Sequence, residues 1–239
     1  MRFACFKPCL VLLASLVCVV ALAQAPRNAP QRVPDTMAQR VLACSACHGK
    51  EGVATNQGYY PRIAGKPAGY LFEQLGNFRA QRRNNAAMAY LLENMTEAYL
   101  LEIAQYFSAL DLPYPPPQGA GVDPSLLVRG RQLVLQGDVQ RGIPPCTACH
   151  GAAMTGRLPA TPGLLGLPRD YVVAQIGAWK TGQRKAEEPD CMAQVAKRLS
   201  MDDIHAVSHW LSSQPVPGNG HPAPATRQTS GIACRGDAP

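Results

Sequence analysis

The chain has 239 residues, enough for one large or two small domains. Its formal charge of +7 includes Arg2 and Lys7, which lie in an N-terminal segment that we expect to be removed. The densest basic cluster, Arg79, Arg82 and Arg83, lies at the end of a predicted helix, and no basic stripe is interleaved with aromatic residues. Composition and charge therefore exclude a nucleic-acid-binding protein.

Residues 1–23 have the pattern of a secretory signal peptide. Two basic residues precede an apolar run over residues 10–22, and a small-x-small cleavage site ends at Ala23. The run is short for a membrane span and proline-rich sequence follows it, which disfavours the alternative of a retained anchor. We expect cleavage after Ala23, a periplasmic mature protein, and contact with the membrane only through partner proteins.

Two halves follow, each with three predicted helices and long loops. We expect helices over residues 35–42, 70–81, 96–110, 123–136, 171–181 and 200–211. Thr96 and Ser200 are good N-cap residues, and acids follow each of them in the first turn. The fold class is therefore all-α. Such small helical units could hardly bury enough apolar surface unaided.

Each half also contains a Cys-x-x-Cys-His motif, at residues 44–48 and 146–150. This spacing lets two thiols form thioethers with both vinyl groups of one haem, while the histidine reaches the iron. A zinc site would need a second cysteine pair nearby, and a redox disulfide is the remaining alternative. The sequence predicts two covalently bound haem c groups that complete the cores of the two domains. The attachment residues are Cys44, Cys47, Cys146 and Cys149, and the iron ligands are His48 and His150.

The repeat extends well beyond these motifs. At a constant offset of 101 residues, one helix of the first half aligns with one of the second: Tyr70, Gln74, Leu75 and Phe78 with Tyr171, Gln175, Ile176 and Trp179. A proline-rich segment separates the halves and favours a stiff, extended connector. We therefore expect a first domain at 24–112, a linker at 113–122, a second domain at 123–214 and an irregular tail at 215–239.

The sixth iron ligand has to come from the opposite face of each haem. Met88 and Met192 each lie eight residues before the predicted N-cap of the third helix, so they occupy the same place in the repeat. Met95 is the rival in the first half, but it aligns with Leu199, where an apolar side chain usually packs onto the following helix. Although a buried methionine is more often core filler than ligand, the double alignment favours Met88 and Met192.

Four paired features carry a family resemblance: Cys-x-x-Cys-His-Gly, Pro-x-x-x-Gly, Tyr-x-x-x-Gln, and a methionine before the last helix. Over roughly residues 36–214 the chain resembles the class I cytochromes c, and specifically the two-domain dihaem cytochromes of the cytochrome c4 family. The resemblance implies that the carbonyls of Pro61 and Pro162 accept hydrogen bonds from the second ring nitrogens of His48 and His150. A plain turn proline is the alternative at both positions.

Ligation by histidine and methionine saturates the iron and leaves no position for a substrate. The sequence therefore predicts an electron carrier between respiratory redox partners rather than an enzyme. The resemblance implies a membrane terminal oxidase as the usual acceptor, and the haem subunit of a periplasmic dehydrogenase would use the same residues. A dihaem peroxidase is a further alternative, but it would need an accessible iron, and ligation by Met88 and Met192 argues against it.

Cys191 keeps an enzymatic alternative open. It directly precedes Met192, and a thiolate there could bind iron, by resemblance to dihaem thiosulfate-oxidising enzymes. The competing interpretation is a disulfide to Cys234, the other cysteine left once the four thioether cysteines are used. A free, reactive Cys191 is the third possibility.

Several basic side chains have two interpretations. Four of them could bind haem propionates or simply solvate helix ends: Arg79, Arg83, Lys180 and Arg184. His205 and His209, one helical turn apart, could bind a metal ion or lie on an exposed helix face.

Overall fold

The computed structural model describes residues 32–54, 58–118, 121, 123–218, 220–226 and 230–235. Contacts divide the chain into two units, Met1–Gln39 and Arg40–Pro239. The predicted signal peptide, residues 1–23, lies outside the described residues. Within the described part, no helix is both long and apolar enough to cross a membrane.

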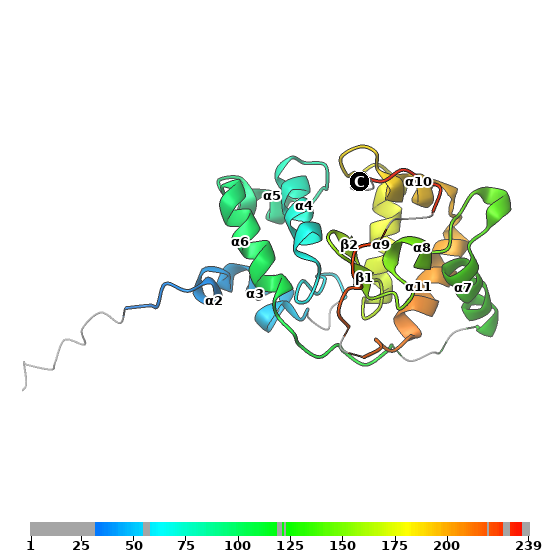
Figure 1. Cartoon of the computed structure of the whole chain (residues 1–239), viewed down its shortest axis with the longest axis horizontal. Coiled ribbons are helices and arrows are strands. Elements are labelled where there is room, and N and C mark those ends of the chain that lie inside the picture. Colours follow the sequence, from blue (N-terminus) through cyan, green and yellow to red (C-terminus); the bar gives the residue numbers. More distant parts are fainter. Residues whose placement is uncertain are drawn as a thin grey trace, which may run out of the picture. The chain divides into compact units, whose positions relative to one another are not determined.

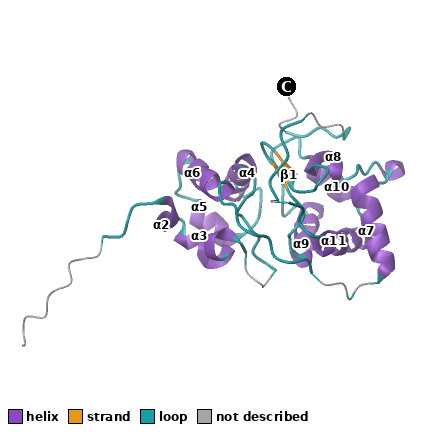
Figure 2. Cartoon of the chain, turned by 60° about the horizontal axis from the view of Figure 1, so that its bottom comes forward, coloured by secondary structure: helices purple, strands orange, loops and turns teal. Residues whose placement is uncertain are grey.

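Helices dominate these residues, which confirms the all-α fold class (Figure 1). The helices of the first half are α2 (Met37–Arg40), α3 (Leu42–His48), a 3-10 turn (Lys50–Gly52), α4 (Ala68–Arg79), α5 (Ala86–Leu92) and α6 (Glu97–Ser108). Those of the second half are α7 (Pro124–Gln136), a 3-10 turn (Val139–Arg141), α8 (Thr147–His150), α9 (Arg169–Lys180), α10 (Cys191–Arg198) and α11 (Met201–Ser213). Two short strands, β1 (Gly156–Arg157) and β2 (Thr161–Pro162), pair antiparallel (Figure 2).

The third helix of each half begins where the sequence predicts. Thr96 Oγ1 accepts a hydrogen bond from the backbone N–H of Tyr99 at 3.3 Å. Ser200 and Asp203 form a capping box, because each side chain accepts from the backbone N–H of the other, at 3.1 and 3.0 Å. These caps satisfy N–H groups that the helix itself cannot pair.

Two predictions about the helices are wrong. The helix expected over 35–42 is interrupted at Val41, and α3 then continues through the first cysteine motif. The segments around Met88 and Met192, predicted as loops, are the short helices α5 and α10. Side-chain caps explain them, since Asn85 Oδ1 accepts from Met88 N at 3.0 Å and Asp190 Oδ1 accepts from Ala193 N at 2.9 Å.

The larger described core belongs to the second half. There α7 packs against α11 at close range, because a Cβ atom at Gly130 would lie 2.1 Å from the carbonyl oxygen of Ala206. The fully buried side chains around this crossing are Leu133, Val134, Ile204 and Leu211. An apolar cluster of the first half centres on Phe78, Leu92 and Leu100, where α4 meets α5 and α6.

The C-terminal tail runs beside the second half without forming a helix among its described residues. Ala223 pairs with the backbone next to β1, since its N–H donates to Gly156 O and its carbonyl accepts from Leu158 N, both at 2.9 Å. The tail therefore adds a short edge to the small sheet that follows the second cysteine motif.

Candidate haem sites

The first motif lies in α3, with His48 as its last residue. The Nδ1 atom of His48 is 2.8 Å from the carbonyl oxygen of Pro61, which fixes that nitrogen as the donor. Burial, with a smaller contribution from Arg83, lowers the pKa of His48 despite this hydrogen bond. The ring is therefore held neutral, with Nε2 left as a bare lone pair suited to a metal ion.

The second motif repeats this geometry in α8. Nδ1 of His150 is 2.7 Å from the carbonyl oxygen of Pro162, at the end of β2. Burial lowers the pKa of His150, and the nearby cations Arg157 and Lys66 lower it further. The structure thus places both prolines against the histidines with which the resemblance pairs them.

A glycine follows each histidine in a left-handed conformation, with φ of 78° at Gly49 and 84° at Gly151. Leaving the helix this way suits glycine, because other residues adopt positive φ at a cost. At Gly49 a Cβ atom would also lie 2.3 Å from the carbonyl oxygen of Ala54. The chain therefore turns sharply as soon as the histidine has been placed.

None of the four motif cysteines forms a disulfide: Cys44, Cys47, Cys146 and Cys149. Burial raises the pKa of Cys44, and it raises that of Cys146 to about 12, with a further contribution from Cys149. Cys44 and Cys146 are therefore held as protonated thiols rather than poised as redox-active thiolates. No group of three His, Cys, Asp or Glu residues in the described part could hold a metal ion, which leaves the zinc interpretation without support.

The donor set therefore fits haem c: two thiols at thioether spacing and one imidazole with a free Nε2 in each half. A bound haem c supplies one-electron chemistry. The residues of the chain would hold the plane and tautomer of each imidazole for such a group.

The candidate distal ligands lie on the helices that the sequence did not predict. Met88 is in the first turn of α5 and is partly buried against Phe78, Leu92 and Leu100. Met95 packs against the same cluster, so burial alone does not separate the two methionines. Met192 is in the first turn of α10 and is half-buried. The roles of Met88 and Met192 as axial ligands stay predictions.

Cys191, the residue before Met192, is bonded to Cys234, with their Cα atoms 5.0 Å apart. An ion pair between Glu187 and Arg235 lies beside this disulfide. The Cys191 sulfur is thus already bonded, and the structure gives no support to a thiolate ligand for iron at this position.

The interpretation of the basic residues as solvated helix ends is wrong for Arg83 and Arg184. Arg83 and Arg184 are only 8% and 5% exposed, because their guanidinium groups are buried between the two halves. Arg79 Nη1 donates to Met95 O at 2.8 Å, and Lys180 Nζ donates to Leu199 O at 2.6 Å. These two side chains hold the segment that leads into the third helix of each half. Sequence reasoning missed these partners, although the repeat does align each pair.

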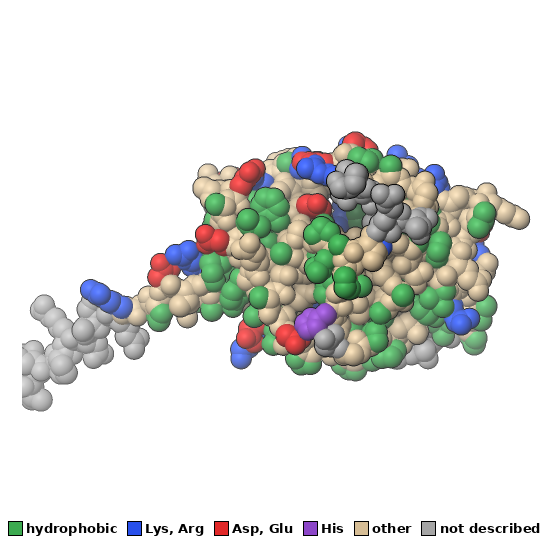
Figure 3. All heavy atoms as spheres, viewed as in Figure 1, with side chains coloured by type: hydrophobic (Ala, Val, Ile, Leu, Met, Phe, Trp, Pro, Cys, Tyr) green, Lys and Arg blue, Asp and Glu red, His purple; other side chains and the backbone are tan. Residues whose placement is uncertain are grey.

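The remaining surface features are unremarkable. His205 is exposed and His209 is half-buried on α11. On the face shown in Figure 3, lysine and arginine side chains are scattered among acidic ones and form no continuous basic surface.

No protein-family model matches the chain. It is 38% identical over 177 residues to a thiosulfate dehydrogenase electron acceptor from Thiomonas intermedia (strain K12), covering 73% of this chain and 79% of that protein. It is 30% identical over 175 residues to a cytochrome c4 from Pseudomonas aeruginosa, covering 72% and 84%. The chain belongs to the cytochrome c4 family.

Solved structures agree with this membership. Reduced cytochrome c4 from Pseudomonas stutzeri matches with a TM-score of 0.65 and 29% identity, over 74% of this chain and 95% of that one. The thiosulfate dehydrogenase TsdBA from Marichromatium purpuratum also matches with a TM-score of 0.65, at 32% identity, but the match spans only 36% of that longer chain and 72% of this one. This cytochrome c4 relative is therefore a dihaem class I cytochrome c with two covalently bound haem groups. It is an electron carrier.

Proposed function

We propose that this cytochrome c4-type chain accepts electrons from an enzyme that oxidises thiosulfate and passes them on one at a time. The similarity to two proteins named thiosulfate dehydrogenase electron acceptor, at 38% and 33% identity, carries this proposal. Its match to part of TsdBA, whose name is that of the dehydrogenase itself, also supports it.

In this proposal each half has the same set of roles. The motif cysteines hold the haem covalently, and His48 and His150 bind the two irons through Nε2. Pro61 and Pro162 fix the rings through the hydrogen bonds at Nδ1. Met88 and Met192 bind from the opposite faces, which leaves the irons closed to substrate and favours electron transfer.

The number of haems suits the chemistry of such a donor. If the donor oxidises two thiosulfate ions by joining them through a new sulfur–sulfur bond, two electrons are released, and a chain that holds two haems would take up one electron at each. One dihaem chain can therefore store the electrons of a single turnover without another acceptor. Transfer to a membrane terminal oxidase, the expected next step, stays a prediction.

We infer a periplasmic location from the signal-peptide pattern and from the Cys191–Cys234 disulfide, since stable disulfides form in oxidising compartments. The proposed domains are 24–112 and 123–214, with 113–122 as the linker. The described linker residues 113–118 have neither helix nor strand, which supports this division.

Stopped-flow mixing tests the proposal. Oxidised dihaem protein would be mixed with a purified thiosulfate dehydrogenase, with and without thiosulfate, while the reduced-haem absorption band is recorded. We expect both haems to be reduced only when enzyme and thiosulfate are both present. Reduction by thiosulfate alone would instead indicate an enzyme, and no reduction with the dehydrogenase would contradict the proposed partner.

A further inference from the structure

Lys66 of the first half reaches the loop that holds the histidine of the second half. Its side chain is only 4% exposed, and its Nζ atom lies 3.4 Å from the carbonyl oxygen of Gly163. Gly163 directly follows Pro162, whose carbonyl accepts the hydrogen bond from His150. A buried cation from the first half therefore contacts the residue next to the proline that holds the histidine of the second half.

The repeat does not place a lysine from the second half in the same position near the first histidine. At the offset of 101 residues, Lys66 aligns with Leu167, which packs against the apolar core of the second half. Gly163 aligns with Arg62, and a Cβ atom at Gly163 would lie 2.5 Å from the carbonyl oxygen of Thr155. Crowding thus excludes a side chain at this position, and its backbone carbonyl is the acceptor for Lys66.

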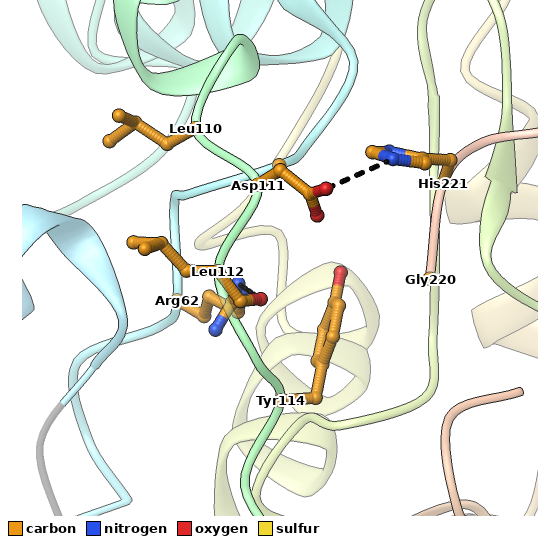
Figure 4. A pocket seen from close by; sticks show the side chains of 8 residues that line it. Arg62, Leu110, Asp111, Leu112, Tyr114, Gly220 and His221 are labelled. Carbon is orange, nitrogen blue, oxygen red and sulfur yellow. Dashed lines mark hydrogen bonds and ion pairs between the residues drawn. The ribbon is translucent and has the colours of Figure 1, made fainter. Parts of the chain in front are cut away.

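The described partners of the Lys66 ammonium group are a backbone carbonyl, that of Gly163, and the aromatic ring of Tyr114. The Tyr114 ring centroid is 5.8 Å from Nζ, and the guanidinium carbon of Arg62 lies 4.1 Å from the same centroid. Figure 4 shows Arg62 on one side of the irregular segment that carries Asp111 and Tyr114, with His221 on the other. The Asp111 carboxylate faces His221 at 3.5 Å. Across the described ranges, no carboxylate forms an ion pair with Lys66.

We propose that Lys66 is a positioning residue that raises the reduction potential of the second haem, the one attached at residues 146–150. This inference rests on the proposed ligation by His150. A positive charge in a poorly solvated interior favours the oxidation state with less positive charge, which is ferrous iron. The electron comes from the redox partner, and no covalent bond forms or breaks. Leu167, which aligns with Lys66, carries no charge and makes no such contribution to the first haem, whose histidine has Arg62 and Arg83 as its nearby buried cations.

The effect should depend on pH. Burial, with a smaller contribution from Arg62, lowers the pKa of Lys66 to about 8. The titratable groups near Lys66 are Arg62 and Tyr114, and Arg157 lies near His150. Asp111 and His221 lie beside Arg62 and Tyr114. Below its pKa, Lys66 keeps its proton and its full effect on the second haem. As the pH rises through that pKa, the proton leaves and the potential of the second haem should fall.

Redox titration of the dihaem protein tests the proposal, with chemical mediators and no partner enzyme. Lys66→Met and Lys66→Gln both remove the charge, and Lys66→Gln keeps a hydrogen-bond donor. At pH 6 we expect each variant to lower the equilibrium constant for reduction of the second haem on the order of tenfold, while that of the first haem stays unchanged. Lys66→Arg should keep the wild-type potential at pH 6 and lose the decline near pH 8. Lys197→Met, which removes an exposed lysine from the half that holds the second haem, is the control.

Mass spectrometry and circular dichroism show whether each variant carries two haems and is folded. NMR of labelled lysine side chains in the reduced protein reports the pKa of Lys66 directly. Equal shifts of both haems, or a wild-type second-haem potential in Lys66→Gln, would overturn the proposal. A chain that carries fewer than two haems would instead contradict the proposed ligation. If thiosulfate dehydrogenase does not reduce the protein, the proposed partner is contradicted, but the potentials measured with mediators are unaffected. If Lys66→Met does not fold, Lys66→Gln and Lys66→Arg still decide the question.

Discussion

Arg83 and Arg184 donate hydrogen bonds to the same two side-chain oxygens, although they belong to different halves of the repeat. Gln74 Oε1 accepts from Arg83 at 3.1 Å and from Arg184 at 2.9 Å. Gln175 Oε1 accepts from the same two residues at 2.7 and 2.8 Å. Their backbones also form an antiparallel bridge. Residues that are equivalent in the repeat thus form a local two-fold arrangement, in which the glutamines come from α4 and α9.

The first prediction concerns the stability of this boundary. Arg83→Leu should lower the free energy of unfolding by about 2–4 kcal/mol, because it leaves buried glutamine oxygens without one of their donors. The same change at Arg184 should have a similar effect. Chemical denaturation of the dihaem protein, followed by circular dichroism, measures the loss.

Arg131→Ala is the control for this prediction. Arg131 is exposed on α7, so its replacement should change stability by no more than about 0.5 kcal/mol. An Arg83→Leu variant as stable as Arg131→Ala would show that the shared hydrogen bonds contribute little.

The second prediction concerns the distal ligands. Met88→Ala and Met192→Ala should each remove part of the methionine-to-iron absorption and lower one of the two midpoint potentials, because the thioether stabilises ferrous iron. Near-infrared and visible spectra with redox titration measure both effects. Met95→Leu, which keeps a similar volume in the same cluster as Met88, should change neither. Loss of the band in Met95→Leu but not in Met88→Ala would mean that the repeat alignment is wrong.

Local sequence signals predicted what depends on local chemistry. Thr96 and Ser200 cap their helices as expected, and the cysteine spacing indicated haem before any fold was known. The helix α10 was missed because its cap, Asp190, precedes a run too short for a clear apolar period. The buried position of Arg83 was missed because its partners lie in the other half, and no local pattern reports contacts of that kind.

The third prediction is a pH dependence of stability that originates at Asp203. Burial opposes ionisation of this carboxyl group, but hydrogen bonds from Arg141, Ser200 and Arg129 outweigh it and hold the pKa of Asp203 below its ordinary value. The stabilisation is therefore present above the unfolded-state pKa of about 4, and it is lost as the pH falls through the lower folded-state value.

Asp203→Asn should flatten the decline of stability below pH 4 and cost about 2–4 kcal/mol at pH 7, since it weakens two arginine contacts and the capping box. Unfolding midpoints between pH 2 and 7 measure this. Asp202→Asn, on the exposed side of the same helical turn, is the matched control. An unchanged acid profile in Asp203→Asn would contradict the assignment.

The fourth prediction is that Cys191 and Cys234 are bonded in the protein purified from an oxidising compartment. Non-reducing peptide mapping should recover the linked fragment. The bond closes a separation of 43 residues, and Cys234→Ser should lower the free energy of unfolding by about 4 kcal/mol in the chain-entropy model. Mild reductant should also ease loss of Met192 from iron at raised pH. Two free thiols would contradict the disulfide and reopen a reactive role for Cys191.

The C-terminal tail contacts the surroundings of the second haem motif. Arg157 donates to the carbonyls of Ala148 and Cys149 at 3.2 and 2.8 Å, and it also donates to Thr226 of the tail at 2.8 Å. The surroundings of the second motif therefore include a residue 69 positions beyond Arg157, so they can form completely only after that part of the tail has been synthesised.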